Sequence, residues 1–255
     1  MSTASLTVSQ VRYVNKTFWR NPARAFFTFA FPLMLLVIFT SLLGGGKEGI
    51  GTLTVNESAY YVVAMAAYGV IQACYSNIAA SVSFQRDAGI LKRIDGSPMP
   101  KASFMGSLII HSMFVGLLLV VVTAAFGRAV YGVSVPTGMA LFQFLVMLAI
   151  GSATFCALGL AVSAAIPNAD AAQPVILGTV LPLCFLSGIF IPFNNSTPSW
   201  LVWIARIFPV RHFAAGMMAG FLGTPFDWTD VLVVAAWGAA GLLLAIRVFR
   251  LQPPT

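Results

Sequence analysis

Charged residues are scarce in this chain. Aspartate, glutamate, lysine and arginine together make up 8% of its 255 residues, whereas a soluble domain carries roughly 25%. Hydrophobic residues make up 59%, so the chain lacks the charge needed to cover a water-exposed surface. The composition therefore predicts an integral membrane protein rather than a soluble domain.

Cysteine and histidine are also few. The three cysteines, Cys74, Cys156 and Cys184, lie far apart in apolar segments without CxxC spacing, which favours buried, reduced thiols. The two histidines, His111 and His212, belong to no cluster of ligand residues in the sequence. We therefore predict no metal site and no cofactor in this chain.

Common nucleotide-binding and catalytic motifs are missing. The sequence has no GxxxxGK[ST] P-loop, no HExxH and no GxSxG, so we expect neither ATP binding by this chain nor enzymatic activity. All seven acidic residues fall in loops or at the ends of apolar segments. Because ion-coupled carriers need ionisable groups inside the bilayer, this disfavours a secondary carrier. His111, near the start of the third apolar segment, is an exception, because it is an ionisable residue that could act as a proton relay.

Long apolar runs, by contrast, are abundant, and we expect an all-α integral membrane protein with six transmembrane helices. We treat residues 1–255 as one transmembrane domain, with a six-span bundle at 25–249 and a short tail at 250–255. The six segments are residues 25–43, 58–83, 102–126, 137–165, 171–191 and 228–249.

Three other segments carry patterns of their own. Residues 1–24 combine basic and apolar side chains, which predicts an amphipathic helix lying at the membrane interface. Residues 192–225 are rich in proline and aromatic residues and too interrupted for a span, which predicts one or two short helices at the outer interface. In Phe84–Lys101, apolar residues recur at helical spacing up to Gly96, which predicts a short amphipathic helix at the membrane surface. A basic loop that only sets the topology is the alternative.

The basic residues predict the orientation. The net charge is +7, but the basic residues form no aromatic-interleaved patch, so nucleic acid is not an expected partner. With six spans, both termini lie on one side, together with Phe84–Lys101. Ten basic residues fall on that side and four on the other, which predicts that both termini are cytoplasmic.

Residues 84–98 resemble the first cytoplasmic loop of ABC-2-type exporter permeases, whose usual form is close to F-E-R-E-x-G-T-L-x-R-L-x-x-[ST]-P. Asp87 replaces the second glutamate conservatively, and Gln85 departs from the first. The matching residues are Phe84, Arg86, Gly89, Leu91, Arg93, Ser97 and Pro98.

A second resemblance follows the fifth apolar segment. Residues 185–192, FLSGIFIP, are similar to the family's F-L-S-G-x-x-x-P motif. Residues 198–201 resemble its P-x-W-L element, and 208–210 resemble N-P-[LV] with Phe208 in place of asparagine. The resemblance covers essentially the whole chain and is closest to the drug- and antibiotic-resistance branch.

This resemblance implies a permease subunit in a bacterial plasma (inner) membrane. Two such chains would pair as a homodimer, and two ATP-binding subunits, which carry the ATP and magnesium, would dock beneath them. Residues 84–93 would form the coupling helix between spans 2 and 3, with Phe84 and Leu91 anchoring it against the spans. The residues implied in ATPase coupling are Phe84, Gln85, Arg86, Asp87, Gly89, Leu91, Lys92, Arg93, Ser97 and Pro98.

The resemblance also implies that residues 192–225 form outer re-entrant helices that close the exit. The residues of this outer gate are Phe185, Ser187, Gly188, Pro192, Pro198, Trp200 and Pro209.

The substrate path is expected to be apolar, with a few polar side chains, which would suit a drug, an antibiotic or a lipid. Alternatively, those polar side chains satisfy hydrogen bonds between helices, worth roughly 0.6–2 kcal/mol each. A self-sufficient carrier or channel, or a non-transporting assembly protein, also stays open. The candidate path residues are Thr40, Ser41, Gln72, Asn77 and Ser187.

Overall fold

The computed structural model describes residues 3–43, 47–50, 53–96, 100–193 and 197–251. Within these residues, six helices are long and apolar enough to cross a membrane, so the six-span prediction is confirmed. The spans are α2 (Pro22–Leu43), a continuous helix at residues 57–87, α6 (Lys101–Tyr131), α7 (Gly138–Ser163), α8 (Ala169–Leu186) and α11 (Trp228–Leu251).

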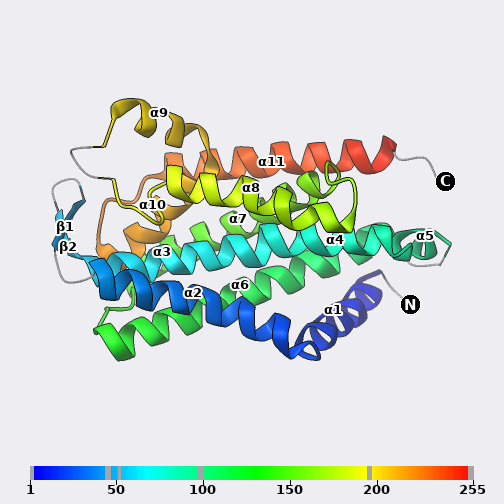
Figure 1. The fold of residues 1–255 in the computed structure, drawn as a ribbon, viewed down its shortest axis with the longest axis horizontal. Coiled ribbons are helices and arrows are strands. Elements are labelled where there is room, and N and C mark those ends of the chain that lie inside the picture. Colours follow the sequence, from blue (N-terminus) through cyan, green and yellow to red (C-terminus); the bar gives the residue numbers. More distant parts are fainter. Residues whose placement is uncertain (1–2, 44–46, 51–52, 97–99, 194–196, 252–255) are drawn as a thin grey trace.

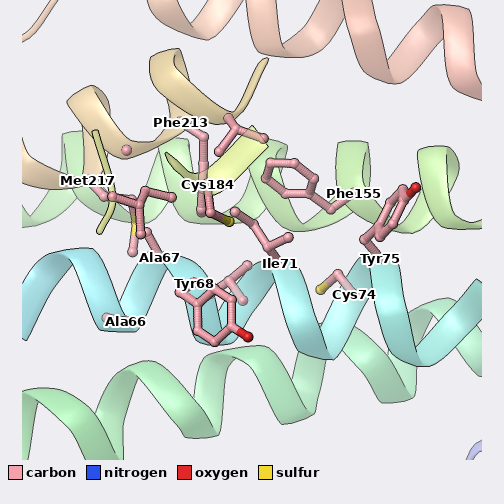
Figure 2. Close-up of a cluster of buried hydrophobic side chains, with 14 of the residues drawn as sticks. Ala66, Ala67, Tyr68, Ile71, Cys74, Tyr75, Phe155, Cys184, Phe213 and Met217 are labelled. Atoms are coloured by element: carbon pink, nitrogen blue, oxygen red, sulfur yellow. The ribbon is translucent and has the colours of Figure 1, made fainter. Parts of the chain in front are cut away.

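The second span is the centre of the bundle. It consists of α3 (Glu57–Ile71), a π-helical turn η1 (Gln72–Ser76) and α4 (Asn77–Asp87). In its most apolar window 83% of the residues are buried, against 17% in α2. Figure 2 shows Ile71 and Tyr75 pointing from this helix toward Phe155 of α7. The other spans therefore pack around the second span, which we call the central helix.

The two ends of the bundle differ. Figure 1 shows α1 (Thr3–Trp19), both termini and α5 (Ile90–Asp95) at one end, here called the terminal end. The opposite end carries an antiparallel pair of strands, β1 (Lys47–Ile50) and β2 (Leu53–Asn56), and is called the hairpin end. These strands lie between the first two predicted spans.

Two short helices complete the hairpin end. They are α9 (Ser199–Ile207) and α10 (Pro209–Leu222). The prediction of one or two short helices between the last two spans is confirmed. α10 is mostly buried, because its apolar face packs against α7 and α3, whereas α9 buries only Ala205.

The predicted bounds of the coupling helix are wrong. Residues 84–87 form the last turn of α4, and the short helix α5 begins only at Ile90. The break falls at Gly89, whose φ of 68° lies in the left-handed region that favours glycine. The central helix continues past the apolar segment because residues 84–88 contain neither glycine nor proline.

Glycines let the helices approach closely at the centre of the bundle. A Cβ atom added to Gly151 would lie 2.2 Å from the ring of Phe213, which joins α7 to α10. One added to Gly159 would lie 2.6 Å from the Tyr75 carbonyl oxygen, where α7 crosses η1. Such small-residue contacts are the usual basis of helix association in membranes.

We expect Gly159→Ala to destabilise the bundle by about 1–3 kcal/mol, because the added methyl group meets main-chain atoms that cannot rotate away. Gly178→Ala on α8 is the matched control, since a Cβ there has no neighbour within 4 Å. Thermal denaturation of the purified protein in mild detergent measures both. Equal melting temperatures for the two variants would contradict the close contact between α7 and η1.

Candidate functional site

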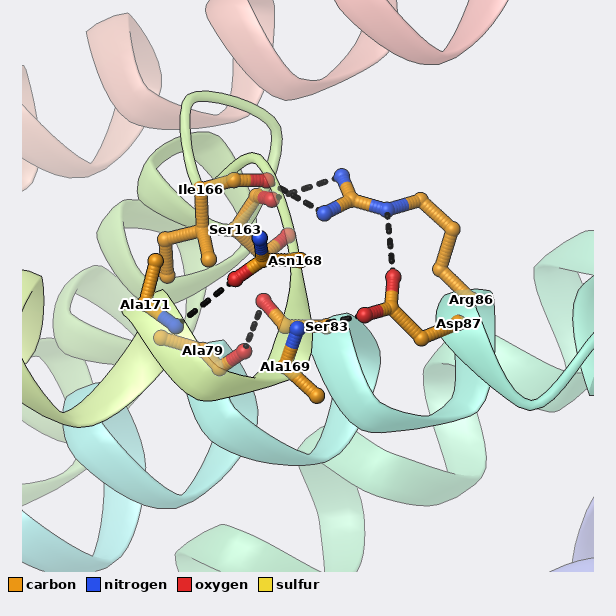
Figure 3. A network of polar contacts seen from close by, with 9 residues as sticks. All are labelled: Ala79, Ser83, Arg86, Asp87, Ser163, Ile166, Asn168, Ala169 and Ala171. Carbon is orange, nitrogen blue, oxygen red and sulfur yellow. Dashed lines mark hydrogen bonds and ion pairs between the residues drawn. The ribbon is translucent and has the colours of Figure 1, made fainter.

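Arg86 and Asp87 lie at the terminal end of the central helix and contact the turn between α7 and α8 (Figure 3). Arg86 donates through Nη1 to the carbonyl oxygen of Ser163 at 3.1 Å and through Nη2 to that of Ile166. Asp87 accepts a hydrogen bond from the backbone N–H of Ala169, and its carboxylate lies 3.9 Å from Nε of Arg86. The pair thus joins three elements of the chain.

The signs of these charges match the helix ends that they contact. Ser163 is the last residue of α7, where carbonyl groups lack partners within the helix and a cation is favourable. Ala169 is the first residue of α8, where free N–H groups favour an anion. Arg86 and Asp87 therefore hold the ends of α7 and α8 within this chain. Their contacts with a partner protein stay a prediction.

The other predicted coupling residues divide into exposed and packed ones. Leu91 packs against the hydrophobic core from α5, as expected. Phe84 is 63% exposed, so its expected role as an anchor against the spans is wrong. Lys92 and Arg93 are exposed and Gln85 is half-buried. Ser97 and Pro98 lie outside the described residues.

The predicted gate residues all lie at the hairpin end. α8 ends at Leu186 rather than at residue 191, and the chain turns at Gly188, whose φ is 79°. Tyr60 of the central helix donates to the carbonyl oxygen of Gly188 and fixes this turn. Phe185 is half-exposed, with its ring centroid 4.9 Å from that of Phe190.

The remaining gate residues lie on and beside the two short helices. Pro192 is half-buried. Pro198 caps α9, on which Trp200 is 62% exposed. Pro209 is buried at the first position of α10, where its missing N–H costs nothing. The structure thus brings the gate residues to one end, although Trp200 points away from the core.

The sequence reasoning missed a contact that holds these short helices. His212 of α10 lies 2.6 Å through Nδ1 from Oδ1 of Asp230 of α11. Its Nε2 lies 2.8 Å from the carbonyl oxygen of Arg206 at the end of α9. The histidine ring thus lies between a carboxylate of α11 and a carbonyl group of α9, two groups that accept hydrogen bonds. In the sequence this contact is marked only by a histidine and an aspartate 18 residues apart. That separation is too long to suggest a contact.

A large groove opens at the side of the bundle near the terminal end. Its volume is about 1130 Å³, and its lining comes from α1, α2, η1, α4, α5, α6 and α8. Two of the predicted path residues, Gln72 and Asn77, line it, together with Phe84, Gln85 and Arg93. The predicted path and the predicted coupling region therefore meet in one groove.

The other predicted path residues lie elsewhere. The Thr40 hydroxyl group donates a hydrogen bond to the carbonyl oxygen of Leu36 at 2.6 Å. The Ser187 hydroxyl group donates one to the carbonyl oxygen of Leu183, one turn earlier. Ser41 is exposed beside Thr40 on α2 and is absent from the lining of the groove. For Thr40 and Ser187 the contacts match the alternative that their hydroxyl groups satisfy helix hydrogen bonds, here within their own helices.

Comparison with known proteins decides the family. The family model of the ABC-2 type transporter matches residues 7–222. The chain belongs to the ABC-2 type transporter family. It is a multi-pass membrane protein of this family.

Individual relatives agree with this assignment. ABC transporter G family member 20 of Dictyostelium discoideum is 30% identical over an alignment of 176 residues that covers 64% of this ABC-2 chain and 24% of the relative. The putative transport permease ycf38 of Porphyra purpurea is 22% identical over 241 residues, 91% of this chain and 79% of the relative. The ABC-2 chain thus spans about a quarter of the first relative and most of the second.

We expect Arg86→Ala to destabilise the protein by about 1.5–3 kcal/mol, because it removes charge-assisted hydrogen bonds at the end of α7. Lys92→Ala, an exposed cation in the same region, is the control and should stay within about 0.5 kcal/mol of the parent protein. The comparison is made by thermal denaturation in detergent. A loss of the same size in both variants would mean that the Arg86 contacts add nothing.

A double-mutant cycle tests the His212–Asp230 contact. We expect His212→Ala and Asp230→Ala to couple by about 1 kcal/mol or more, because their side chains are only 16% and 19% exposed. Melting temperatures of the two single variants and the double variant give the coupling. Additive losses would show that the histidine and the aspartate do not hold α10 to α11.

Proposed function

We propose that this chain is the permease subunit of an ATP-driven exporter for a hydrophobic or amphipathic substrate, such as a drug, an antibiotic or a lipid. It resides in the plasma (inner) membrane of a bacterium with both termini in the cytoplasm. A second copy of the chain pairs with it, and two separate ATP-binding subunits supply the energy. The drug- and antibiotic-resistance branch, and thus a role in efflux, is part of this proposal.

The observation that carries the proposal is the position of α5. It follows the end of the central helix, on the same end of the bundle as both termini. Its exposed Lys92, which does not line the groove, presents positive charge to the surroundings. This arrangement suits a docking surface for an ATP-binding subunit better than it suits a simple connecting loop, which would need no packed helix.

The contacts around α4 suggest how docking reaches the spans. A displacement of α5 acts on the last turn of the central helix, where Arg86 and Asp87 grip the turn between α7 and α8. Spans that move as bodies around such a contact open one side of the membrane and close the other. The coupling residues therefore work as a unit, with Lys92 facing the ATP-binding subunit and Arg86 and Asp87 facing the turn between α7 and α8.

The groove supports the choice of substrate class. It combines apolar side chains such as Phe31 and Leu177 with polar ones such as Gln72 and Asn77. Its exposed aromatic rings on α2, including Phe27, favour contact with apolar matter.

The proposal is tested by pulling down the tagged chain from native membranes in a gentle detergent and assaying ATP hydrolysis in the eluate. We expect an ATP-binding subunit in about equal amount and measurable ATPase activity. A chain that elutes alone and inactive would overturn the exporter proposal. Flux driven by an ion gradient in liposomes would then point to a carrier or channel.

Charge reversal separates docking from folding. We expect Lys92→Glu to lower the recovery of the ATP-binding subunit several-fold, while the melting temperature of the chain stays unchanged, because Lys92 is exposed. Arg128→Glu is the matched control, since Arg128 is an exposed cation near the opposite end of α6. Equal recovery with both variants would place the docking surface elsewhere.

A further inference from the structure

The groove is lined, in the part of the chain that the structure describes, by positive charge without negative charge. Among its lining residues the structure describes two arginines, Arg24 and Arg93, and neither an aspartate nor a glutamate. A cleft lined by charge of one sign attracts ligands of the opposite sign, especially where low-dielectric walls surround it. The groove is therefore suited to an anion, although most of its wall is apolar.

Arg24 is held in a fixed position at the groove. Its Nη2 donates to Oδ1 of Asn77 and, at 2.9 Å, to Oγ of Ser81, both on α4. Its guanidinium carbon lies 5.8 Å from the centroid of the Phe18 ring. All of these partners are neutral, and no ion pair of Arg24 is found among the described side chains. The positive charge is thus positioned by the protein without being neutralised by it.

Two buried polar atoms in the same lining lack partners. His111 on α6 is 3% exposed, and its Nδ1 has no hydrogen-bond partner among the described residues. Oγ of Ser76, which directly precedes Asn77 in the central helix, is also buried and has no hydrogen-bond partner among the described residues. The His111 ring centroid lies 5.2 Å from that of Phe18, the ring that Arg24 also covers. Because unpaired buried polar atoms are costly, both atoms point to a ligand that hydrogen-bonds them.

An apolar strip adjoins these polar groups. Phe27 and Phe31 follow Arg24 by one and two turns on α2, and Leu177 faces the groove from α8. All three are among the exposed large hydrophobic side chains, at 66%, 40% and 45%. The groove therefore offers a cationic end and an apolar strip, the two halves of a site for a charged amphiphile.

We propose that this groove binds an amphiphile with an anionic phosphate or carboxylate head group and an apolar tail. Arg24 binds the head group, with His111 and Ser76 as additional hydrogen-bond donors, and the tail lies along Phe27, Phe31 and Leu177. This names the substrate class within the proposed export function and rests on that function for its transport role. The binding itself does not depend on an ATP-binding subunit.

The test measures binding to the full chain in nanodiscs of phosphatidylcholine, without the ATP-binding subunit. The probes are dodecyl phosphate, dodecanoate and dodecyltrimethylammonium, which share a tail and differ in the head group. We expect both anionic probes to bind about tenfold or more tightly than the cationic one, the size of one charge-assisted hydrogen bond. Equal affinity for all three probes would overturn the proposal.

Free inorganic phosphate distinguishes an amphiphile site from a simple anion site. We expect it to displace dodecyl phosphate only weakly, because it gains nothing from the apolar strip. Displacement by inorganic phosphate as strong as by unlabelled dodecyl phosphate would show that the tail contributes nothing and would contradict an amphiphile site.

Variants locate the head group. We expect Arg24→Gln to weaken dodecyl phosphate binding about tenfold and to leave dodecyltrimethylammonium binding unweakened, whereas Arg24→Lys, which keeps the charge, retains part of the preference. Arg20→Gln is the matched control, because Arg20 is an exposed arginine four residues earlier that does not line the groove. Equal losses with Arg24→Gln and Arg20→Gln would overturn the role of Arg24.

This result is independent of the ATPase assay. Anion preference without a co-purifying ATP-binding subunit would keep the binding site and overturn the export function. An active complex without anion preference would keep the exporter and overturn the substrate class.

Discussion

Close packing of the central helix against α6, α7 and α10 is the constraint on which the rest of the structure depends. Inside a bilayer, apolar side chains gain little by leaving lipid for protein, so helices associate through close contact and a few hydrogen bonds. Gly151 and Gly159 of α7 provide that closeness, because any larger side chain would meet Phe213 or the backbone of Tyr75. The π-helical turn η1 lies at the second of these contacts.

The central helix also connects the two ends of the molecule. At the terminal end Arg86 and Asp87 contact the turn that joins α7 to α8. At the hairpin end Tyr60 holds the turn that follows α8. Both ends of α8 are thus tied to the same helix. A movement of the central helix at the terminal end therefore also moves Tyr60 and the turn after α8 at the hairpin end. The proposed export mechanism requires such a connection.

The sequence predicted the helical architecture well, because long apolar runs can satisfy their backbone in lipid only as helices. It located the short helices at 192–225 from proline and aromatic residues, and it identified the family from the residues around Arg86 and Ser187. It failed where the outcome depends on tertiary contact. The residues around Phe84 are helical, but Gly89 divides them between α4 and α5. The spacing of apolar residues also does not show whether the Phe84 side chain is buried or exposed.

The groove and the histidine contact are invisible in the sequence for a similar reason. Arg24 meets Asn77 and Ser81 across more than 50 residues, and His212 meets Asp230 across 18. No local pattern marks either set. Gln72 and Asn77 were found because a polar side chain in an apolar run is conspicuous, whereas Arg24 looked like one more basic residue at the start of a span.

The central claim, that α5 at the end of the central helix is the surface that meets the ATP-binding subunit, is tested most directly by site-specific photo-crosslinking in native membranes. A photoreactive amino acid is placed at residue 92, and for comparison at residue 128 near the opposite end of α6. The account predicts a crosslink to an ATP-binding protein from residue 92 that strengthens or weakens with added ATP, and none from residue 128. A crosslink from residue 128, or from neither residue, would contradict it.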